Sequence, residues 1–218
     1  MSNSTTDPTT LEEQPITDPA RWRLWLEQHG TWPSDQILDI GARYLARNRG
    51  GTNTGLLIIG NVGCGKTYLM KLIARKIEHC EWIEASRLPA LYKADEEAFR
   101  DRIENRRFSL MDVDRDNQNR VYTPSALIID DIGAETKCNN YGAVVEPIAE
   151  ALAIRSSFRD EWQQPLLMTS NLPLSHPDPN VVSITSRYGE RTVSRIRGLC
   201  WIVNAKGGDR RGQDLTEL

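Results

Sequence analysis

Apolar residues recur along the chain with two different spacings, and these spacings predict a succession of helices and strands. Trp22, Trp25 and Leu26 lie at helical spacing after Asp18, a residue type that often caps a helix. A second helical pattern follows, with Ser34 as its predicted cap. Farther along, short apolar runs alternate with helical patterns, which is typical of a parallel α/β sheet. The expected strands are residues 56–59, 82–83, 126–129, 166–169 and 201–203, and the expected helices lie within residues 69–77, 86–107, 147–158 and 188–199.

Composition narrows the class of protein. The chain has 218 residues and a formal net charge of −3. No apolar run approaches the roughly 20 residues that a membrane helix needs, and the first residues are neither basic nor apolar, unlike a secretory signal. The four cysteines lie far apart and form no CxxC pair, which indicates reduced thiols in a cytoplasmic protein. These observations argue against a membrane protein, a disulfide scaffold, a zinc finger and a strongly basic nucleic-acid coat.

The small net charge hides an uneven distribution of charged residues. Residues 1–19 carry four acidic residues and neither Lys nor Arg, and their many Ser, Thr and Pro residues predict disorder. Residues 187–211 carry seven basic and two acidic residues, a local charge of +5. The basic side of the protein is therefore predicted to be its C-terminal end.

Residues 60–67 (GNVGCGKT) match the phosphate-binding pattern G-x-x-x-x-G-K-[ST] in full. Glycines let the backbone approach a phosphate, and N–H groups at the start of the following helix point at the anion. Lys66 adds a positive charge for the β- and γ-phosphates, and Thr67 offers a hydroxyl to Mg²⁺. Cys64 alternatively is a thiol made reactive by the helix N-terminus. The residues predicted to bind ATP are Gly60, Asn61, Val62, Gly63, Cys64, Gly65, Lys66, Thr67 and Tyr68.

An apolar run ends in two acids at Asp130 and Asp131. A buried strand that ends in an acid is how a P-loop nucleoside triphosphatase places a carboxylate near Mg²⁺. We therefore expect Thr67 and Asp130 to serve the metal, and Asp131 to orient the attacking water. In other contexts, two adjacent aspartates mark a turn or a helix cap.

A later apolar run ends in Asn171, and a basic segment follows it. An asparagine at a strand end can hydrogen-bond the attacking water or the γ-phosphate, although it also commonly starts a turn. Arg191 and Arg195 lie four residues apart, on one face of a predicted helix. Arginines with this spacing can reach a phosphate on a neighbouring subunit, or they form a solvated basic face.

Four segments in this order resemble the AAA+ ATPases, and most closely the bacterial replicative helicase loaders of the DnaC type and the related IstB-like transposition ATPases. The segments are GNVGCGKT (60–67), LIIDDIGAE (127–135), PLLMTSNLP (165–173) and YGERTVSRI (188–196). The resemblance implies roles for the matching positions: Lys66 and Thr67 as Walker A, Asp130 as Walker B, Asp131 at the usual position of the catalytic glutamate, Asn171 as sensor 1, Arg195 as the arginine finger and Arg191 as a second candidate. Arg159 also matches a family position, without an assigned role.

The same resemblance implies an architecture. It is a P-loop fold of three layers, α/β/α, around a five-stranded parallel sheet, without a C-terminal helical lid. The expected division is a disordered acidic N-terminus (1–18), a short helical extension (19–50), the AAA+ core (51–205) and a tail (206–218).

The resemblance further implies an ATPase whose shorter Asp131 suits slow, switch-like hydrolysis. With ATP and Mg²⁺ it would self-assemble through Arg195 acting in trans, hold single-stranded DNA and deliver a hexameric replicative helicase. Residues 86–107 are candidates for DNA contact, or form a solvated helix face. The tryptophans at 22, 25 and 32 are candidates for helicase docking, or pack on the protein's own core.

The alternative functions are an IstB-like ATPase that polymerises on DNA and recruits a transposase, a small-molecule kinase, and a nucleotide-gated adaptor.

Overall fold

A computed structural model describes residues 17–30, 34–49, 54–77, 80–104, 126–140, 142–157 and 165–207. Its centre is a five-stranded sheet in which every pair of neighbours is parallel, in the order β2-β3-β6-β1-β7. The strands are β1 (Gly55–Gly60), β2 (Cys80–Glu84), β3 (Ala126–Ile132), β6 (Leu166–Ser170) and β7 (Cys200–Ala205). The main helices are α1 (Pro19–His29), α2 (Asp35–Arg49), α3 (Lys66–Lys76), α4 (Leu88–Ala94), α5 (Glu96–Glu104), α6 (Pro147–Ser157), α8 (Ile184–Tyr188) and α9 (Glu190–Leu199). The predicted five-stranded α/β sheet is confirmed.

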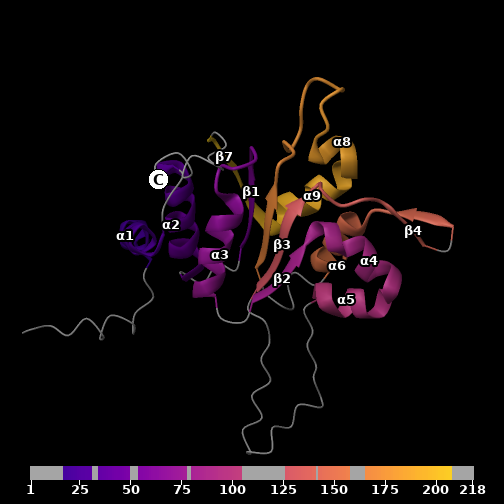
Figure 1. Cartoon of the computed structure of the whole chain (residues 1–218), viewed down its shortest axis with the longest axis horizontal. Helices are drawn as coiled ribbons and strands as arrows, with labels where there is room; N and C mark the ends of the chain where they lie inside the picture. Colours follow the sequence, from indigo (N-terminus) through magenta and orange to yellow (C-terminus); the bar gives the residue numbers. More distant parts are fainter. Residues whose placement is uncertain are drawn as a thin grey trace, which may run out of the picture.

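Helices cover both faces of the sheet, and each face has its own core (Figure 1). Residues along a strand point alternately to opposite faces. Leu56 and Ile58 therefore pack with α1, α2 and α3, while Leu57 and Ile59 pack with α6 and α9. The result is the three-layer arrangement that the sequence predicts. None of the helices in the ranges given above has the length and apolar character to cross a bilayer.

The first two helices belong to one of these cores. Asp18 caps α1 by accepting a hydrogen bond from the backbone N–H of Ala20, and Pro19 occupies the first turn, as predicted. Trp22 is only 5% exposed and belongs to the core that includes α3. Trp25 is half-buried, stacks on His29 and lies under the Lys76 ammonium. Trp22 is therefore a packing residue, which contradicts its interpretation as an exposed docking residue; position 32 lies outside the described residues.

Replacing Trp22 with Phe should lower the free energy of unfolding by about 1–2 kcal/mol, because a smaller ring leaves space in a closed core. Urea denaturation followed by circular dichroism measures this change. Leu24→Ala is the matched control, since Leu24 is 59% exposed on the same helix, and its effect should stay within about 0.5 kcal/mol. Equal stability of Trp22→Phe and wild type would contradict the packing role.

The prediction of one or two helices within residues 86–107 is confirmed over the described residues by α4 and α5, which follow a short 3-10 turn at Ala85–Arg87. Other elements differ from the prediction. A helix expected from Tyr188 to Leu199 is two helices, because Gly189 adopts a φ of +82° between α8 and α9. A small antiparallel hairpin, β4 (Cys138–Asn140) and β5 (Ala143–Val145), was not predicted and projects beside α4 in Figure 1. The predictions for residues 1–16, Arg159 and residues 208–218 lie outside the described residues.

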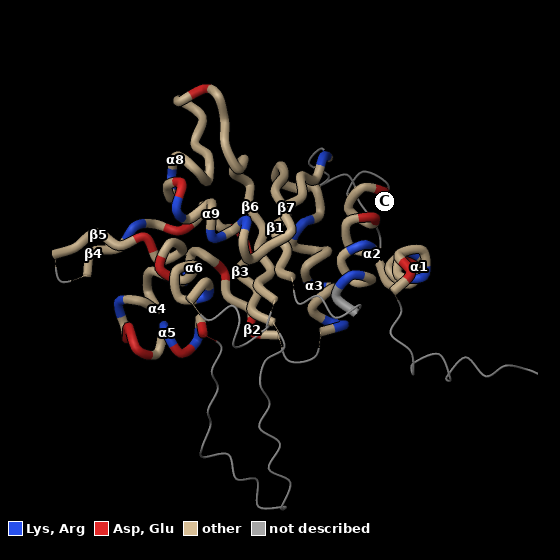
Figure 2. The backbone as a smooth tube through the Cα atoms, turned by 180° about the vertical axis from the view of Figure 1, so that it is seen from behind, with Lys and Arg blue, Asp and Glu red and all other residues tan. Residues whose placement is uncertain are grey.

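Charges on α4 and α5 are mixed. Lys93 is the one charged residue of α4, whereas α5 carries both acidic and basic residues (Figure 2). Arg102 pairs with Glu81 of β2 at 2.5 Å, so part of the positive charge is already neutralised. DNA contact by residues 86–107 remains a prediction, and residues 105–107 lie outside the described residues.

Candidate active site at the carboxyl edge of the sheet

The phosphate-binding loop lies between β1 and α3, as its sequence predicts. Gly63 and Gly65 adopt φ angles of +78° and +95°, which side chains strongly disfavour. A Cβ on Gly60 would lie 2.5 Å from the carbonyl oxygen of Ala205, so β7 leaves room only for glycine there. The loop therefore delivers the backbone N–H groups of the first turn of α3 to the carboxyl edge of the sheet, where an anion can bind.

Lys66 points back over this loop instead of out into solvent. Its ammonium donates hydrogen bonds of 2.8 Å to the carbonyl oxygens of Gly60 and Asn61, and one of 2.8 Å to Oδ1 of Asn171. The side chain is buried, and burial lowers the pKa of this ammonium. The predicted Walker A lysine and the predicted sensor asparagine therefore meet, although 105 positions separate them.

Asp130 is buried at the end of β3, and two hydroxyls converge on it. Thr67 donates to its Oδ1 at 3.0 Å, and Thr169 donates to the same oxygen at 2.5 Å. The predicted Walker A threonine and Walker B aspartate are thus in contact. The sequence analysis does not predict Thr169 as a site residue; the available signal is a hydroxyl near the strand end, two positions before Asn171.

Asp131 lies at an irregularity near the end of β3 and begins a turn that the N–H of Ala134 closes onto its carbonyl oxygen. Its φ is +60°, and the pairing of β3 with β6 shifts register between Ile129 and Ile132. Its N–H donates to Oγ1 of Thr169 at 2.8 Å, and its Oδ1 accepts from Nδ2 of Asn171 at 2.6 Å. The turn therefore points the half-buried Asp131 carboxylate toward Asn171, on the side of Lys66.

The donor set fits magnesium. Mg²⁺ prefers oxygen ligands and is commonly held by one or two carboxylates together with substrate phosphates and water. Thr67 and Asp130 supply a hydroxyl and a carboxylate that already lie 3.0 Å apart. Among the described residues, no group of three or more His, Cys, Asp or Glu side chains could hold a metal by itself, so phosphate oxygens would have to complete such a site.

Thr169→Val should lower the rate of ATP hydrolysis by about tenfold, because a hydrogen bond to a charged group contributes about 1.5–3 kcal/mol. Valine keeps the shape of threonine but removes the donor to Asp130 and the acceptor for the Asp131 N–H. A steady-state ATPase assay measures the loss. Thr169→Ser keeps the hydroxyl and should retain most of the activity; equal losses in both variants would contradict the hydrogen-bonding role.

Arg191 and Arg195 are not brought to this loop. They lie on α9, which packs on the face of the sheet opposite α3 (Figure 1). Arg191 is exposed and Arg195 is half-exposed. Among the described residues, neither guanidinium makes an ion pair or a hydrogen bond. This position leaves the two guanidinium groups open to an anion from outside the chain. The helix α3, which begins at Lys66, packs on the other face of the sheet.

Cys64 is closed off from solvent. It is 1% exposed, and a Cβ on Gly207 would lie 3.2 Å from its own Cβ. Such a thiol packs the loop against the chain that follows β7. The burial argues against the interpretation of Cys64 as a reactive thiol.

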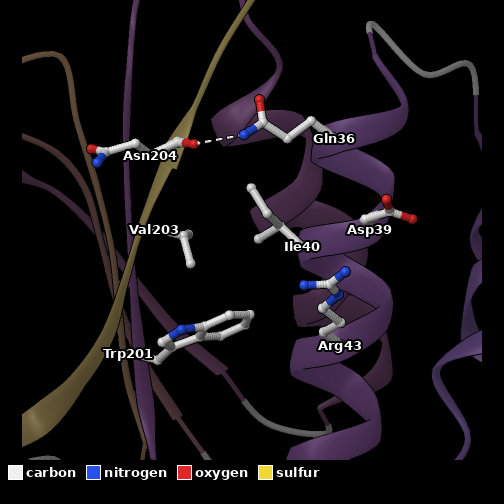
Figure 3. Close-up of a pocket in the computed structure, with 7 residues that line it drawn as sticks. All are labelled: Gln36, Asp39, Ile40, Arg43, Trp201, Val203 and Asn204. Atoms are coloured by element: carbon white, nitrogen blue, oxygen red, sulfur yellow. Dashed lines mark hydrogen bonds between the residues drawn. The ribbon is translucent and has the colours of Figure 1, made fainter.

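A pocket of about 260 Å³ lies between α2 and β7, and none of its lining residues belongs to the phosphate-binding loop. The side-chain amide of Gln36 donates to the carbonyl oxygen of Asn204 (Figure 3). It also accepts from the N–H of Lys206, so it pairs with the edge of β7 as a neighbouring strand would. Ile40, Arg43 and Trp201 line the space below it. The helical extension thus protects the edge strand β7.

The fold and the loop define a P-loop nucleoside triphosphatase. A model of the family described as "ATPase family associated with various cellular activities (AAA)" matches residues 56–193. The chain therefore belongs to the AAA family of ATPases, whose members bind nucleotides. No curated protein sequence matches the chain significantly.

Solved structures share the fold at low sequence identity. The chain is similar to DnaI, with a TM-score of 0.53 and 18% identity over 82% of this chain and 89% of DnaI. It also matches the DnaC helicase loader, with a TM-score of 0.49 and 20% identity over 81% of this chain and 94% of that one. Domain III of the Thermotoga maritima replication initiation protein DnaA matches with a TM-score of 0.45 and 16% identity, over 78% and 59% of the two chains. At 18% identity, the similarity to DnaI shows a common fold alone.

Proposed function

We propose that this AAA protein is an ATP-dependent DNA replication factor of the helicase-loader type. With ATP and single-stranded DNA it would assemble and deliver a hexameric replicative helicase, acting in the cytoplasm. The observation that carries the proposal is the convergence of Lys66, Asp130 and Asn171 at one edge of the sheet. Arg191 and Arg195, from the YGERTVSRI segment, lie on α9 and are exposed and half-exposed. This set of motifs, in this order, is what resembles the helicase loaders.

The phosphate-binding loop would hold ATP with Mg²⁺. Residues 60–68 would surround the phosphates, and Lys66 would exchange its contacts with loop carbonyls for the β- and γ-phosphates. Thr67 and Asp130 would hold the metal, directly or through water, and the metal would neutralise phosphate charge. Support comes from the 3.0 Å hydrogen bond between these two side chains, which brings a hydroxyl and a carboxylate together beside the loop.

Hydrolysis would use Asp131 and Asn171. The Asp131 carboxylate would accept the proton of the attacking water. Asn171 would hydrogen-bond to both Asp131 and the γ-phosphate and so hold them in position relative to each other. The 2.6 Å hydrogen bond between the two side chains supports this pairing. Because aspartate is one methylene shorter than glutamate, we expect slow turnover, as suits a switch.

Assembly would complete the site. Arg195 of one subunit would reach the nucleotide of the next, with Arg191 as the second candidate. An arginine supplied from another subunit stabilises the negative charge of the transition state. The exposure of α9 on the face away from Lys66 supports action in trans.

Size measurement tests the proposal. The protein is examined by light scattering with a non-hydrolysable ATP analogue, with and without a single-stranded oligonucleotide, and a hexameric replicative helicase is then added. We expect larger assemblies with both ligands and transfer of the helicase onto the single strand. Assembly on duplex DNA that captures a transposase instead would favour the IstB-like alternative. A monomer under all conditions would contradict both.

A further inference from the structure

A buried carboxylate lies directly beyond the Asp131 turn. Glu135 is 2% exposed, yet both of its oxygens are paired. Oε2 accepts from the N–H of Gly133 at 2.9 Å, and Oε1 accepts from the Tyr188 hydroxyl and from Arg187 at 3.1 Å. Burial and the hydrogen bond to Glu135 raise the pKa of Tyr188, so this phenol remains a donor. A carboxyl group buried this far from solvent is stable only when donors such as these satisfy its oxygens.

Two of these side chains, Arg187 and Glu135, also hydrogen-bond to the backbone of the Asp131 turn. Arg187 donates to the carbonyl oxygen of Gly133 at 2.8 Å and to that of Glu135. The N–H of Ala134 closes the turn onto the carbonyl oxygen of Asp131 at 3.2 Å. Both backbone polar groups of Gly133, two positions after Asp131, are therefore held by Glu135 and Arg187.

Two of these residues, Arg187 and Tyr188, belong to α8, the helix that precedes α9 and its arginines. Arg187 and Tyr188 end α8, and Gly189 alone separates them from α9. The hydroxyl of Thr192, in the first turn of α9, donates to the carbonyl oxygen of Tyr188 at 2.9 Å. Tyr188 is thus bonded to Glu135 through its phenol and to α9 through its backbone.

The start of α8 is attached to the loop after Asn171. The N–H of Ile184 donates to the carbonyl oxygen of Pro173 at 2.8 Å, and that of Thr185 to the carbonyl oxygen of Leu174 at 3.0 Å. The short helix α8 therefore contacts the segments that follow both predicted hydrolytic residues, and Gly189 joins it to α9, which carries Arg195.

We propose that Glu135, Arg187 and Tyr188 are positioning residues that hold the Asp131 turn of a subunit's own site and the Arg195 helix offered to its neighbour in one arrangement. Movement of the turn at one nucleotide is thereby transmitted to the arginine that serves the next. This inference rests on the proposed trans role of Arg195. It assigns a function to the buried Glu135 and Tyr188 and to the partly buried Arg187, none of which belongs to the predicted nucleotide or metal site.

Tyr188→Phe tests the proposal because it removes one hydroxyl and keeps the ring. In the pure variant, we expect kcat for ATP hydrolysis to fall about tenfold with KM within about twofold, since small displacements of positioned groups mainly cost turnover. Tyr92→Phe is the matched control, as Tyr92 is buried in the same core away from the turn. Its kcat should equal that of wild type. Thermal unfolding confirms that both variants are folded at the assay temperature.

Mixed assemblies separate the two halves of the proposal. Asp131→Asn subunits can donate Arg195 but not hydrolyse, and Arg195→Ala subunits can hydrolyse only with a donated arginine, so mixing them should restore activity. Tyr188→Phe is then added to the donor alone or to the acceptor alone. We expect a lower restored rate in both cases. A loss in only one case, or in neither, would overturn the coupling while leaving the trans arginine intact. No restoration without Tyr188→Phe would overturn the trans role itself and, with it, this inference.

Discussion

Arg195→Ala is expected to lower the kcat of ATP hydrolysis by about two to three orders of magnitude, because an arginine finger stabilises charge that develops only in the transition state. The affinity for ATP should change by no more than about twofold, because the phosphate-binding loop supplies the ground-state contacts. The positions of the two residues support an action of Arg195 on a neighbouring subunit. Arg195 is half-exposed on α9, and Lys66 lies with α3 on the other face of the sheet.

Steady-state hydrolysis and binding of a fluorescent ATP analogue measure the two quantities separately. Arg197→Ala is the matched control. Arg197 is exposed on the same helix and lies just outside the YGERTVSRI segment (188–196) that resembles the family. Arg191→Ala distinguishes the two candidates, because only the true finger should show the large loss. An Arg195→Ala protein that assembles and hydrolyses normally would remove the assignment.

The parts of the fold that could be predicted are those whose signal is local. Leu56–Ile59 form an uninterrupted apolar run because β1 is central and both of its faces are covered. The hairpin of β4 and β5 has three-residue strands with little apolar pattern, so nothing in its sequence indicates pairing. The break between α8 and α9 depends on the backbone of Gly189, and a glycine within a helical pattern does not by itself reveal a turn.

The candidate site divides in the same way. The loop at 60–67 and the acid at Asp130 carry recognisable local patterns. Thr169 becomes a partner of Asp130 only because Ile129 pairs with Met168, which places the next residues of β3 and β6 side by side. The contact of Glu135 with Arg187 and Tyr188 joins segments more than 50 positions apart. Contacts of this kind depend on the register and packing of the whole sheet.

Asp131→Asn should reduce kcat by about 10²–10⁴-fold, the usual contribution of a general base. The change is unusually clean at this position. Asp131 has a φ of +60°, a conformation in which aspartate and asparagine are the best tolerated side chains after glycine. Asparagine can also keep the hydrogen bond from Nδ2 of Asn171 through its amide oxygen, so only the basicity of the carboxylate is lost.

ATP binding and assembly should therefore survive in Asp131→Asn, and assemblies formed with ATP should persist as they do with a non-hydrolysable analogue. Single-turnover hydrolysis and light scattering measure the two properties on the same sample. Asp131→Ala is the informative comparison: it removes the same carboxylate but places a residue that disfavours positive φ in the turn, so it should also lower stability, by about 1 kcal/mol. Unimpaired hydrolysis by Asp131→Asn would exclude Asp131 as the base and leave Asn171 and the metal to orient the water.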